Sequence, residues 1–257
     1  MKQRLDVEIA RRGLAQSRES AQRLIMAGRV RVNSRPAAKP DLRVDPEARI
    51  EVVGPVSEYA SRGAYKLIAA LDHFAIAVAG RNALDVGASN GGFTDVLLRR
   101  GVAQVIALDV GYGQLAHRLR MDARVTMLDR TNIRFVRAQD LPYRPDLIVV
   151  DVSFISLKLV LPRLIDVVAP AADLIALIKP QFEVGKGQVG KGGIVRDEKP
   201  MFAAVDAVIG CARAAGLSSA GVIESPITGA SGNREFLALL RYGSGNLIAS
   251  RGPAPDR

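Results

Sequence analysis

The chain has 257 residues, of which 48% are hydrophobic and 24% are charged, a composition typical of globular proteins with one large or two smaller domains. The single cysteine, Cys211, excludes an internal disulfide and favours a reducing, cytoplasmic setting. The charged first residues and the interrupted apolar windows predict neither a secretory signal nor a membrane-spanning helix, so we expect no membrane association.

Positive charge is concentrated near the N-terminus. Residues 1–50 hold 12 Lys and Arg against 6 Asp and Glu. The difference, +6, is more than half of the formal net charge of +10. Nucleic acid is the commonest cytoplasmic polyanion, so this asymmetry predicts a nucleic-acid partner. The alternative is a solvated surface that only aids solubility.

Residues 1–54 are predicted to form a small α/β domain. Two segments with helical spacing of apolar residues come first, and Ser17 is the expected N-cap of the second segment. The alternating stretches 29–33 and 48–53 predict two strands, with turn-forming residues after the first one. Basic side chains are spread around this domain.

The stretch "SRESAQRLIMAGRVRVNSRPAAKPDLRV" (17–44) resembles the RNA-binding domain named after the fourth small-subunit ribosomal protein. In that family the second helix and the following strand present arginines to folded RNA. The resemblance therefore implies RNA as the partner, although it indicates no reaction. The candidate RNA-binding residues are Arg4, Arg18, Arg23, Arg29, Arg31 and Lys39.

A second, larger domain is predicted over residues 64–247, after a linker at 55–63 that contains proline and glycine and before a tail at 248–257. Apolar strand-like segments alternate with helical patterns along it. This order predicts a seven-stranded, mostly parallel sheet of the Rossmann-like α/β class, with helices on both faces. The expected strands are 82–86, 104–109, 124–128, 146–151, 173–178, 219–224 and 236–241.

The stretch "LDVGASNGGF" (84–93) predicts a strand, a glycine turn and the start of a helix, the place where such sheets hold a ligand. Its spacing does not match the dinucleotide fingerprint, and Asp85 would repel a pyrophosphate but suit a cationic sulfonium. Asp109 follows the next strand 24 positions later, where a ribose-binding carboxylate belongs. The two acids favour S-adenosylmethionine over NAD.

A second glycine-rich stretch, "GKGQVGKGG" (185–193), nearly matches a phosphate-binding loop. Gly192 stands where that loop needs Ser or Thr, and the stretch does not join a strand to a helix. We therefore expect a mobile basic loop near a polyanionic substrate and no nucleotide hydrolysis.

The segments "ALDVGASNGGFTDVLL" (83–98) and "ALDVGYGQL" (107–115) resemble motifs one and two of the class I, FtsJ-type S-adenosylmethionine methyltransferases. The resemblance implies the class I methyltransferase fold and S-adenosylmethionine as cofactor. The alternative is a glycine turn in a domain that binds nothing. The candidate cofactor-binding residues are Asp85, Gly87, Ala88, Ser89, Asn90, Gly91, Gly92, Phe93, Asp109, Val110, Asp129 and Asn132, the last two because "DRTNIR" would lie near the adenine.

Four charged residues stand at strand ends or helix starts: Lys66, Asp151, Lys179 and Glu235. FtsJ-like ribose methyltransferases carry lysine, aspartate, lysine and glutamate in this chain order, which implies a catalytic set. A ribose hydroxyl needs positioning and proton removal, and lysine can act as the base if its pKa is lowered. We expect Lys179 to be the base, Asp151 to orient it and hold the donor methyl, and Lys66 and Glu235 to steer the ribose and its phosphate. Taken alone, Lys66 and Glu235 could be surface charges.

Six segments spread over the chain resemble the TlyA, or haemolysin A, family: "SRGAYKL" (61–67), "DVGASNGGFTD" (85–95), "DRTNIR" (129–134), "DVSFISL" (151–157), "KPQFE" (179–183) and "SPITGASGNREFL" (225–237). The resemblance implies 2′-O-methylation of cytidine in rRNA of the large subunit and, in some members, of the small subunit. The alternatives are a cytolysin, although no inserting segment is evident, and a non-catalytic RNA-binding module. We expect no metal; the target nucleotide and the oligomeric state stay open. Tyr59, Tyr65 and Tyr112 are candidates for stacking on a base.

Overall fold

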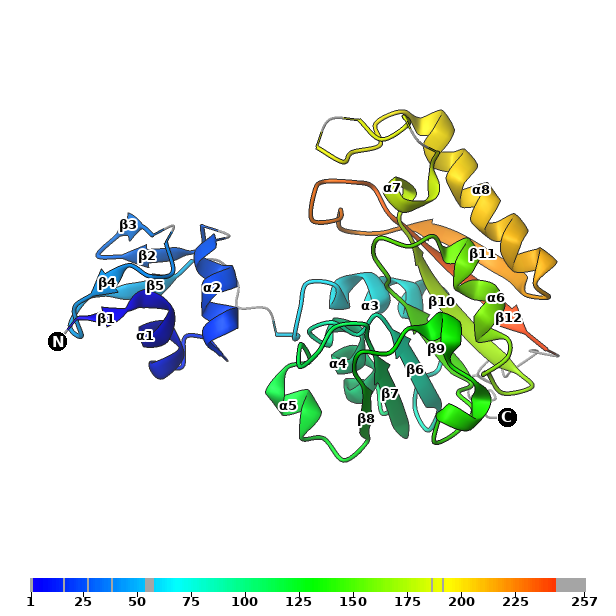
Figure 1. Ribbon diagram of the computed structural model, residues 1–257, viewed down its shortest axis with the longest axis horizontal. Helices are drawn as coiled ribbons and strands as arrows, with labels where there is room; N and C mark the ends of the chain where they lie inside the picture. The colour runs from blue at the N-terminus through cyan, green and yellow to red at the C-terminus, as the bar shows by residue number, and fades with distance from the viewer. Residues whose placement is uncertain are drawn as a thin grey trace, which may run out of the picture. The chain divides into compact units, whose positions relative to one another are not determined.

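The computed structural model describes residues 2–15, 17–26, 28–37, 39–53, 58–185, 187–190 and 192–243, except for the side chain of Arg23. The chain divides into two compact units, Met1–Glu58 and Tyr59–Arg257 (Figure 1). The predicted tail, 248–257, lies outside the described residues.

The first unit packs two helices against short antiparallel strands. Both predicted helices are present, as α1 (Leu5–Arg11) and α2 (Arg18–Met26), and Ser17 caps α2 because its Oγ accepts from the Ser20 amide at 3.1 Å. The strands are β1 (Gln3–Arg4), β2 (Val30–Val32), β3 (Arg35–Pro36), β4 (Arg43–Val44) and β5 (Ile50–Val52). β3, β2 and β5 form one sheet, and β1 pairs with β4. The two predicted strands are thus β2 and β5, while β1, β3 and β4 are too short to show an alternating pattern.

The second unit is built on a seven-stranded sheet in the order β11-β12-β10-β9-β6-β7-β8. β6 to β10 run parallel to one another, and β12 is antiparallel to both of its neighbours, β10 and β11. The strands are β6 (Asn82–Val86), β7 (Gln104–Leu108), β8 (Val125–Leu128), β9 (Leu147–Val150), β10 (Ala172–Ile178), β11 (Ser218–Glu224) and β12 (Phe236–Tyr242). All seven predicted strands are present with nearly the predicted bounds.

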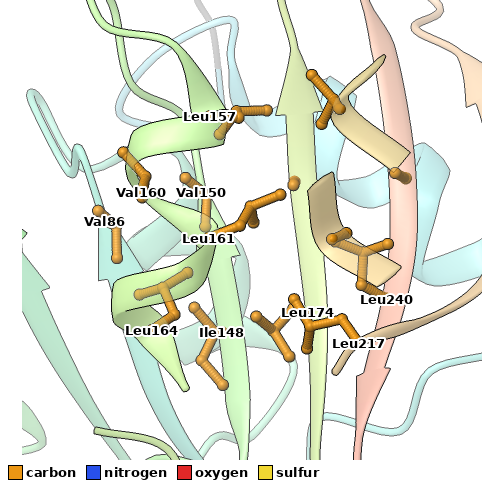
Figure 2. Close-up of a cluster of buried hydrophobic side chains, with 14 of the residues drawn as sticks. Val86, Ile148, Val150, Leu157, Val160, Leu161, Leu164, Leu174, Leu217 and Leu240 are labelled. Carbon is orange, nitrogen blue, oxygen red and sulfur yellow. The ribbon is translucent and has the colours of Figure 1, made fainter. Parts of the chain in front are cut away.

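Helices cover both faces of this sheet (Figure 1). The longer helices are α3 (Ala64–His73), α4 (Gly92–Arg99) and α8 (Glu198–Ala214); the single turns are α5 (His117–Arg120), α6 (Leu161–Leu164), α7 (Pro180–Glu183), η1 (Ile133–Phe135), η2 (Ala138–Asp140) and η3 (Leu157–Leu159). Figure 2 shows the core on the face that α6 and η3 cover, where Leu161 and Leu164 meet Ile148 and Val150 of β9. β9 and β10 are buried along their whole length, as their near-continuous apolar sequence requires. Among the described residues no helix is long and apolar enough to cross a bilayer.

Segment 59–63, predicted as linker, packs on the second unit. The amide of Ala60 donates to Asp95 Oδ2 at 2.8 Å, and the guanidinium of Arg99 lies 4.5 Å from the centre of the Tyr59 ring. Residues 54–57 lie outside the described part of the chain. The second unit therefore includes the residues immediately before α3.

The carboxyl ends of five parallel strands meet at one edge of the sheet. Because β6 to β10 share one direction, the residues that follow them are brought together there. The cofactor-loop glycines follow β6, and Asp109, Asp129, Asp151 and Lys179 follow β7, β8, β9 and β10 in turn. This edge is where the site lies.

Candidate active site

A cleft of about 560 Å³ opens at this edge, within the size range of small-molecule sites. It is lined by the segment before α3 and the first turn of that helix, the loop after β6, the residues that follow β9 and β10, Gly193, and the segment before β12. All four predicted catalytic residues, Lys66, Asp151, Lys179 and Glu235, are among the lining residues. Residues far apart in the sequence are thus brought to one surface.

The four charges form two tight ion pairs. Lys66 Nζ lies 2.5 Å from Glu235 Oε2, and Lys179 Nζ lies 2.6 Å from Asp151 Oδ1. The Lys66 and Glu235 side chains are 8% and 2% exposed, so each charge compensates a partner that water can hardly reach. Glu235 stands just before β12 and Lys66 in the first turn of α3, which explains how one pair spans 169 positions of sequence.

Lys179 has a second partner that the sequence did not indicate. Its Nζ also donates to Ser153 Oγ at 2.9 Å. A protonated lysine has three N–H donors, and a neutral one has two donors and a lone pair. With Asp151 and Ser153 as acceptors, one position on Nζ remains for a substrate group.

Phe154 is a further lining residue that the sequence analysis missed. Its side chain is 91% exposed, and its backbone φ is +63°, a value that a bulky residue seldom adopts. Its ring centre lies 5.2 Å from that of Phe182, which also lines the cleft. An exposed aromatic ring in the same cleft as Lys179 is suited to stacking on a nucleic-acid base.

The loop after β6 lines the cleft through Gly87, Ala88, Ser89, Asn90, Gly92 and Phe93. Gly87 has a φ of +88°, and a Cβ there would overlap the carbonyl oxygen of Asp151. Glycine at this position therefore permits close packing of the loop against the end of β9. The loop leads into α4, whose first amides face the same edge.

Asp85 lies beneath this loop and does not itself line the cleft. Its Oδ2 accepts from Thr94 Oγ1 at 2.7 Å, while its buried Oδ1 has no hydrogen-bond partner among the described residues. Burial, with smaller contributions from Asp151 and Asp109, raises the pKa of Asp85 to about 7. A carboxylate left without a countercharge at this edge fits a cationic ligand above the loop.

Asp109, Val110, Asp129 and Asn132 follow β7 or β8 and do not line the cleft. Asp109 Oδ2 accepts from the Ser89 amide at 2.8 Å and so joins the end of β7 to the glycine loop. Asp129 Oδ2 accepts from the Gly113 amide at 3.0 Å, and Asn132 Oδ1 caps η1 by accepting from the Arg134 amide at 3.1 Å. Val110 is 70% exposed. The remaining predicted residue, Gly91, is buried at the N-cap of α4.

Three features of this edge fit a ligand that carries both a nucleoside and a positively charged sulfur. The loop backbone lies close enough to the end of β9 to exclude a side chain at Gly87, and the orphaned Asp85 oxygen lies below it. Asp109 is half-exposed at the next strand end, where a ribose would be bound. These residues would hold S-adenosylmethionine.

The predicted RNA-binding residues belong to the first unit. Asp6 is fully buried and accepts from Arg4 Nε and Arg18 Nε, both at 3.0 Å. Hydrogen bonds from Arg4, Gln22 and Arg18 hold the pKa of Asp6 well below its usual range, against the effect of burial. Arg31 and Lys39 are exposed, and Arg29 Nε donates to the Val53 carbonyl at 3.1 Å. The side chain of Arg23 lies outside the described residues.

The base-stacking candidates differ in their surroundings. The Tyr59 and Tyr65 rings meet edge to face with their centres 5.8 Å apart, and Tyr112 is 69% exposed with the Arg130 guanidinium 4.3 Å from its ring centre. None of the three lines the cleft, whereas Phe154 does.

Comparisons with known proteins agree with this architecture. The FtsJ-like methyltransferase family matches residues 59–242, and the S4 domain matches residues 3–50. A 16S/23S rRNA (cytidine-2′-O)-methyltransferase TlyA from Mycobacterium tuberculosis is 50% identical over 250 residues, which cover 97% of this chain and 93% of that protein. A solved structure from Streptococcus thermophilus that carries a hemolysin name is 40% identical, covers 95% of this chain and 89% of its own, and has a TM-score of 0.75.

At the level of the fold alone, the chain is similar to the N-methyltransferase NodS from Bradyrhizobium japonicum in complex with S-adenosyl-L-homocysteine. That match has a TM-score of 0.51 at 16% identity and covers 72% of this chain and 89% of the other. The sheet order and the loop at its carboxyl edge thus define a Rossmann-like methyltransferase, and the predicted fold class is confirmed.

With an S4 domain ahead of the FtsJ-like methyltransferase domain, and a relative 50% identical along nearly the whole chain, this protein belongs to the TlyA family. The predicted family is therefore confirmed.

Proposed function

We propose that this methyltransferase transfers a methyl group from S-adenosylmethionine to the ribose 2′-hydroxyl of a cytidine in large-subunit rRNA. One observation carries the proposal: two lysine–carboxylate pairs share a cleft with the glycine loop at the carboxyl edge of the sheet. The name of the M. tuberculosis relative supports cytidine as the nucleoside and rRNA as the substrate. Acting on rRNA would place the protein in the cytoplasm.

Lys179 is the proposed base. As a neutral amine it would donate its two N–H groups to Asp151 and Ser153, which leaves its lone pair for the proton of the 2′-hydroxyl. When bound, S-adenosylmethionine supplies a methyl group activated by the adjacent positive sulfur. The hydroxyl becomes strongly acidic as it is alkylated, so a base held in place is sufficient. Asp151 orients Lys179 in this scheme.

Lys66 and Glu235 are proposed to hold the ribose and its phosphate in the same cleft. Their pairing fixes the ammonium of Lys66 before RNA arrives, which lowers the cost of ordering it during binding. Phe154 is proposed to stack on the cytosine base, because RNA enzymes that act on one nucleotide hold it outside the surrounding stack. The S4 domain supplies the wider contact with rRNA through the basic residues named above.

The test is methyl transfer from labelled S-adenosylmethionine to separately isolated large and small ribosomal subunits, with the modified nucleoside identified by mass. The expected product is 2′-O-methylcytidine in the large subunit, and label in the small subunit would identify a second target. A methylated base would contradict ribose chemistry, and label in neither subunit would contradict rRNA as the substrate.

The role of Lys179 is tested by Lys179→Ala. We expect turnover to fall at least about 100-fold, the usual contribution of general base catalysis, with binding to ribosomal subunits unchanged. Lys158→Ala is the matched control, because Lys158 is a half-buried lysine near the same edge that does not line the cleft. Turnover by Lys179→Ala close to that of the wild type would remove Lys179 from the mechanism.

A further inference from the structure

Asp95 ends the motif "DVGASNGGFTD", yet neither chemistry nor cofactor contact accounts for it. It lies in the first turn of α4 and is 1% exposed. Burial alone would raise its pKa, but hydrogen bonds from Arg118 and the Ala60 amide outweigh burial and lower it. The carboxylate is therefore charged, buried and fully engaged.

Three segments converge on this carboxylate. Arg118 of α5 approaches both oxygens, with Nη1 2.9 Å from Oδ1 and Nη2 on Oδ2. The Ala60 amide donates to Oδ2 at 2.8 Å, and Arg99 Nε donates to Oδ1 at 3.1 Å. Asp95 thus joins α4 to α5 on one side and to the segment before α3 on the other.

α5 and the segment before α3 also contact the glycine loop directly. From the α5 side, Leu115 and Leu119 lie so close to Gly91 that a Cβ there would overlap both, and the Ala116 amide donates to the Asn90 carbonyl at 3.2 Å. From the other side, Ser61 Oγ occupies the place that a Cβ on Gly92 would take. The loop is held between α5 and residue 61.

We propose that Asp95 and Arg118 are positioning residues for the methyl-donor loop: their ion pair, together with the Asp95–Ala60 bond, fixes both neighbours of residues 87–92. Neither side chain lines the cleft. In this proposal the Asp95 carboxylate fixes the conformation of the donor-binding loop without contacting the donor. The identity of the donor in this inference rests on the proposed function, while the clamp itself does not.

The test compares Arg118→Gln with Arg100→Gln in the full-length protein. Both arginines pair with an aspartate and are similarly exposed, at 39% and 40%, but Arg100 binds Asp72, away from the loop. S-adenosylhomocysteine binding is measured by calorimetry, and we expect about a tenfold higher Kd for Arg118→Gln, as for loss of a charged hydrogen bond, and a wild-type Kd for Arg100→Gln. In turnover, the KM for the donor should rise while kcat at saturation is retained.

Hydrogen exchange without any ligand gives a second readout. Amides of residues 87–92 should exchange faster in Arg118→Gln, while amides of β10 in the centre of the sheet keep their wild-type rates. Asp95→Asn, which keeps the side-chain shape, should show the same pattern. Unchanged loop exchange and an unchanged Kd would overturn the proposal. If the wild type itself fails to bind S-adenosylhomocysteine, the proposed donor is wrong, and the exchange rates still decide the clamp.

Discussion

Asp85 and Lys179 are both buried ionisable groups at the same edge of the sheet, but their surroundings differ. Lys179 has a carboxylate 2.6 Å away, whereas Asp85 is hydrogen-bonded by the uncharged Thr94 and has one oxygen without a partner among the described residues. A buried acid without a countercharge is held in its neutral form. Ionisation of Asp85 therefore destabilises the folded state.

This difference predicts how stability depends on pH. The pKa of Asp85 is about 7 in the folded protein, against 3.8 for the free side chain, so between these values the unfolded chain has lost a proton that the folded chain keeps. The contribution of Asp85 to the free energy of unfolding should fall as pH rises from about 4 to 7, by up to about 4 kcal/mol.

Urea denaturation of the wild type and of Asp85→Asn at a series of pH values measures this contribution of Asp85 to the free energy of unfolding. The variant should gain on the wild type as pH rises through this window and keep that advantage at pH 8. A constant difference from pH 5 to pH 8 would contradict it. A bound cationic donor should stabilise the charged form and reduce the effect.

Single residues also show where sequence reasoning ended. Lys66, Asp151, Lys179 and Glu235 could be predicted to share one site because each stands at a strand end or helix start, and all four line the cleft. Their catalytic roles stay predictions. Phe154 was not predicted. It stands out by its exposed side chain and its left-handed backbone conformation, and the neighbouring sequence indicates neither of these.

At the scale of elements, the loop between β6 and α4 depends on backbone approach. Gly87 combines a φ of +88° with a Cβ position that overlaps the carbonyl of Asp151, and Gly113 has a φ of +65° with no atom within 4 Å of its Cβ position. An added side chain would cause backbone strain at both positions but steric overlap only at Gly87, so the two positions distinguish these effects.

We expect Gly113→Ala to cost about 1 kcal/mol of stability, since it adds strain alone, and to leave methyl transfer intact. Gly87→Ala should cost about 3 kcal/mol or more and lower turnover, because the new methyl group displaces the end of β9 and with it Asp151. Chemical denaturation and turnover of both variants provide the comparison. Equal effects would show that the overlap relaxes without moving the site.

Elements were predictable in proportion to their length and apolar content. β9 and β10, four and seven residues long and fully buried, are apolar at every position except Asp173. The two-residue strands β1, β3 and β4, and the single turns α6 and α7, carry no periodicity, because tertiary packing alone selects them. The ion pair between Lys66 and Glu235 likewise follows from the sheet order, which no local pattern contains.

At the scale of the whole molecule, two units divide the positive charge unequally. The four predicted catalytic residues are two lysines and two carboxylates, so together they have no net charge with which to attract RNA. The S4 domain, with half of its lysines and arginines left unbalanced by acids over residues 1–50, should therefore dominate ionic attraction.

Arg31→Ala in the full-length protein should weaken binding to ribosomal subunits and reduce the slope of log K against log salt by about 1, as for loss of one phosphate contact. Arg137→Ala removes an exposed arginine of the methyltransferase domain that pairs with Asp140, and should leave the slope unchanged. Binding measured over a range of salt concentrations distinguishes the two. Equal slopes for Arg31→Ala and wild type would place the RNA contact elsewhere.

The position of β12 in the sheet also orders events during synthesis. It is the last described strand in sequence, yet it lies between β10 and β11, and Glu235 stands at its start. The S4 domain is complete once residue 58 has emerged, whereas the cleft lacks Glu235 until about 180 more residues are made. At about 5–20 residues per second, the nascent chain spends roughly 10–40 s with a complete S4 domain but without Glu235, the residue to which the proposed function assigns part of the ribose contact.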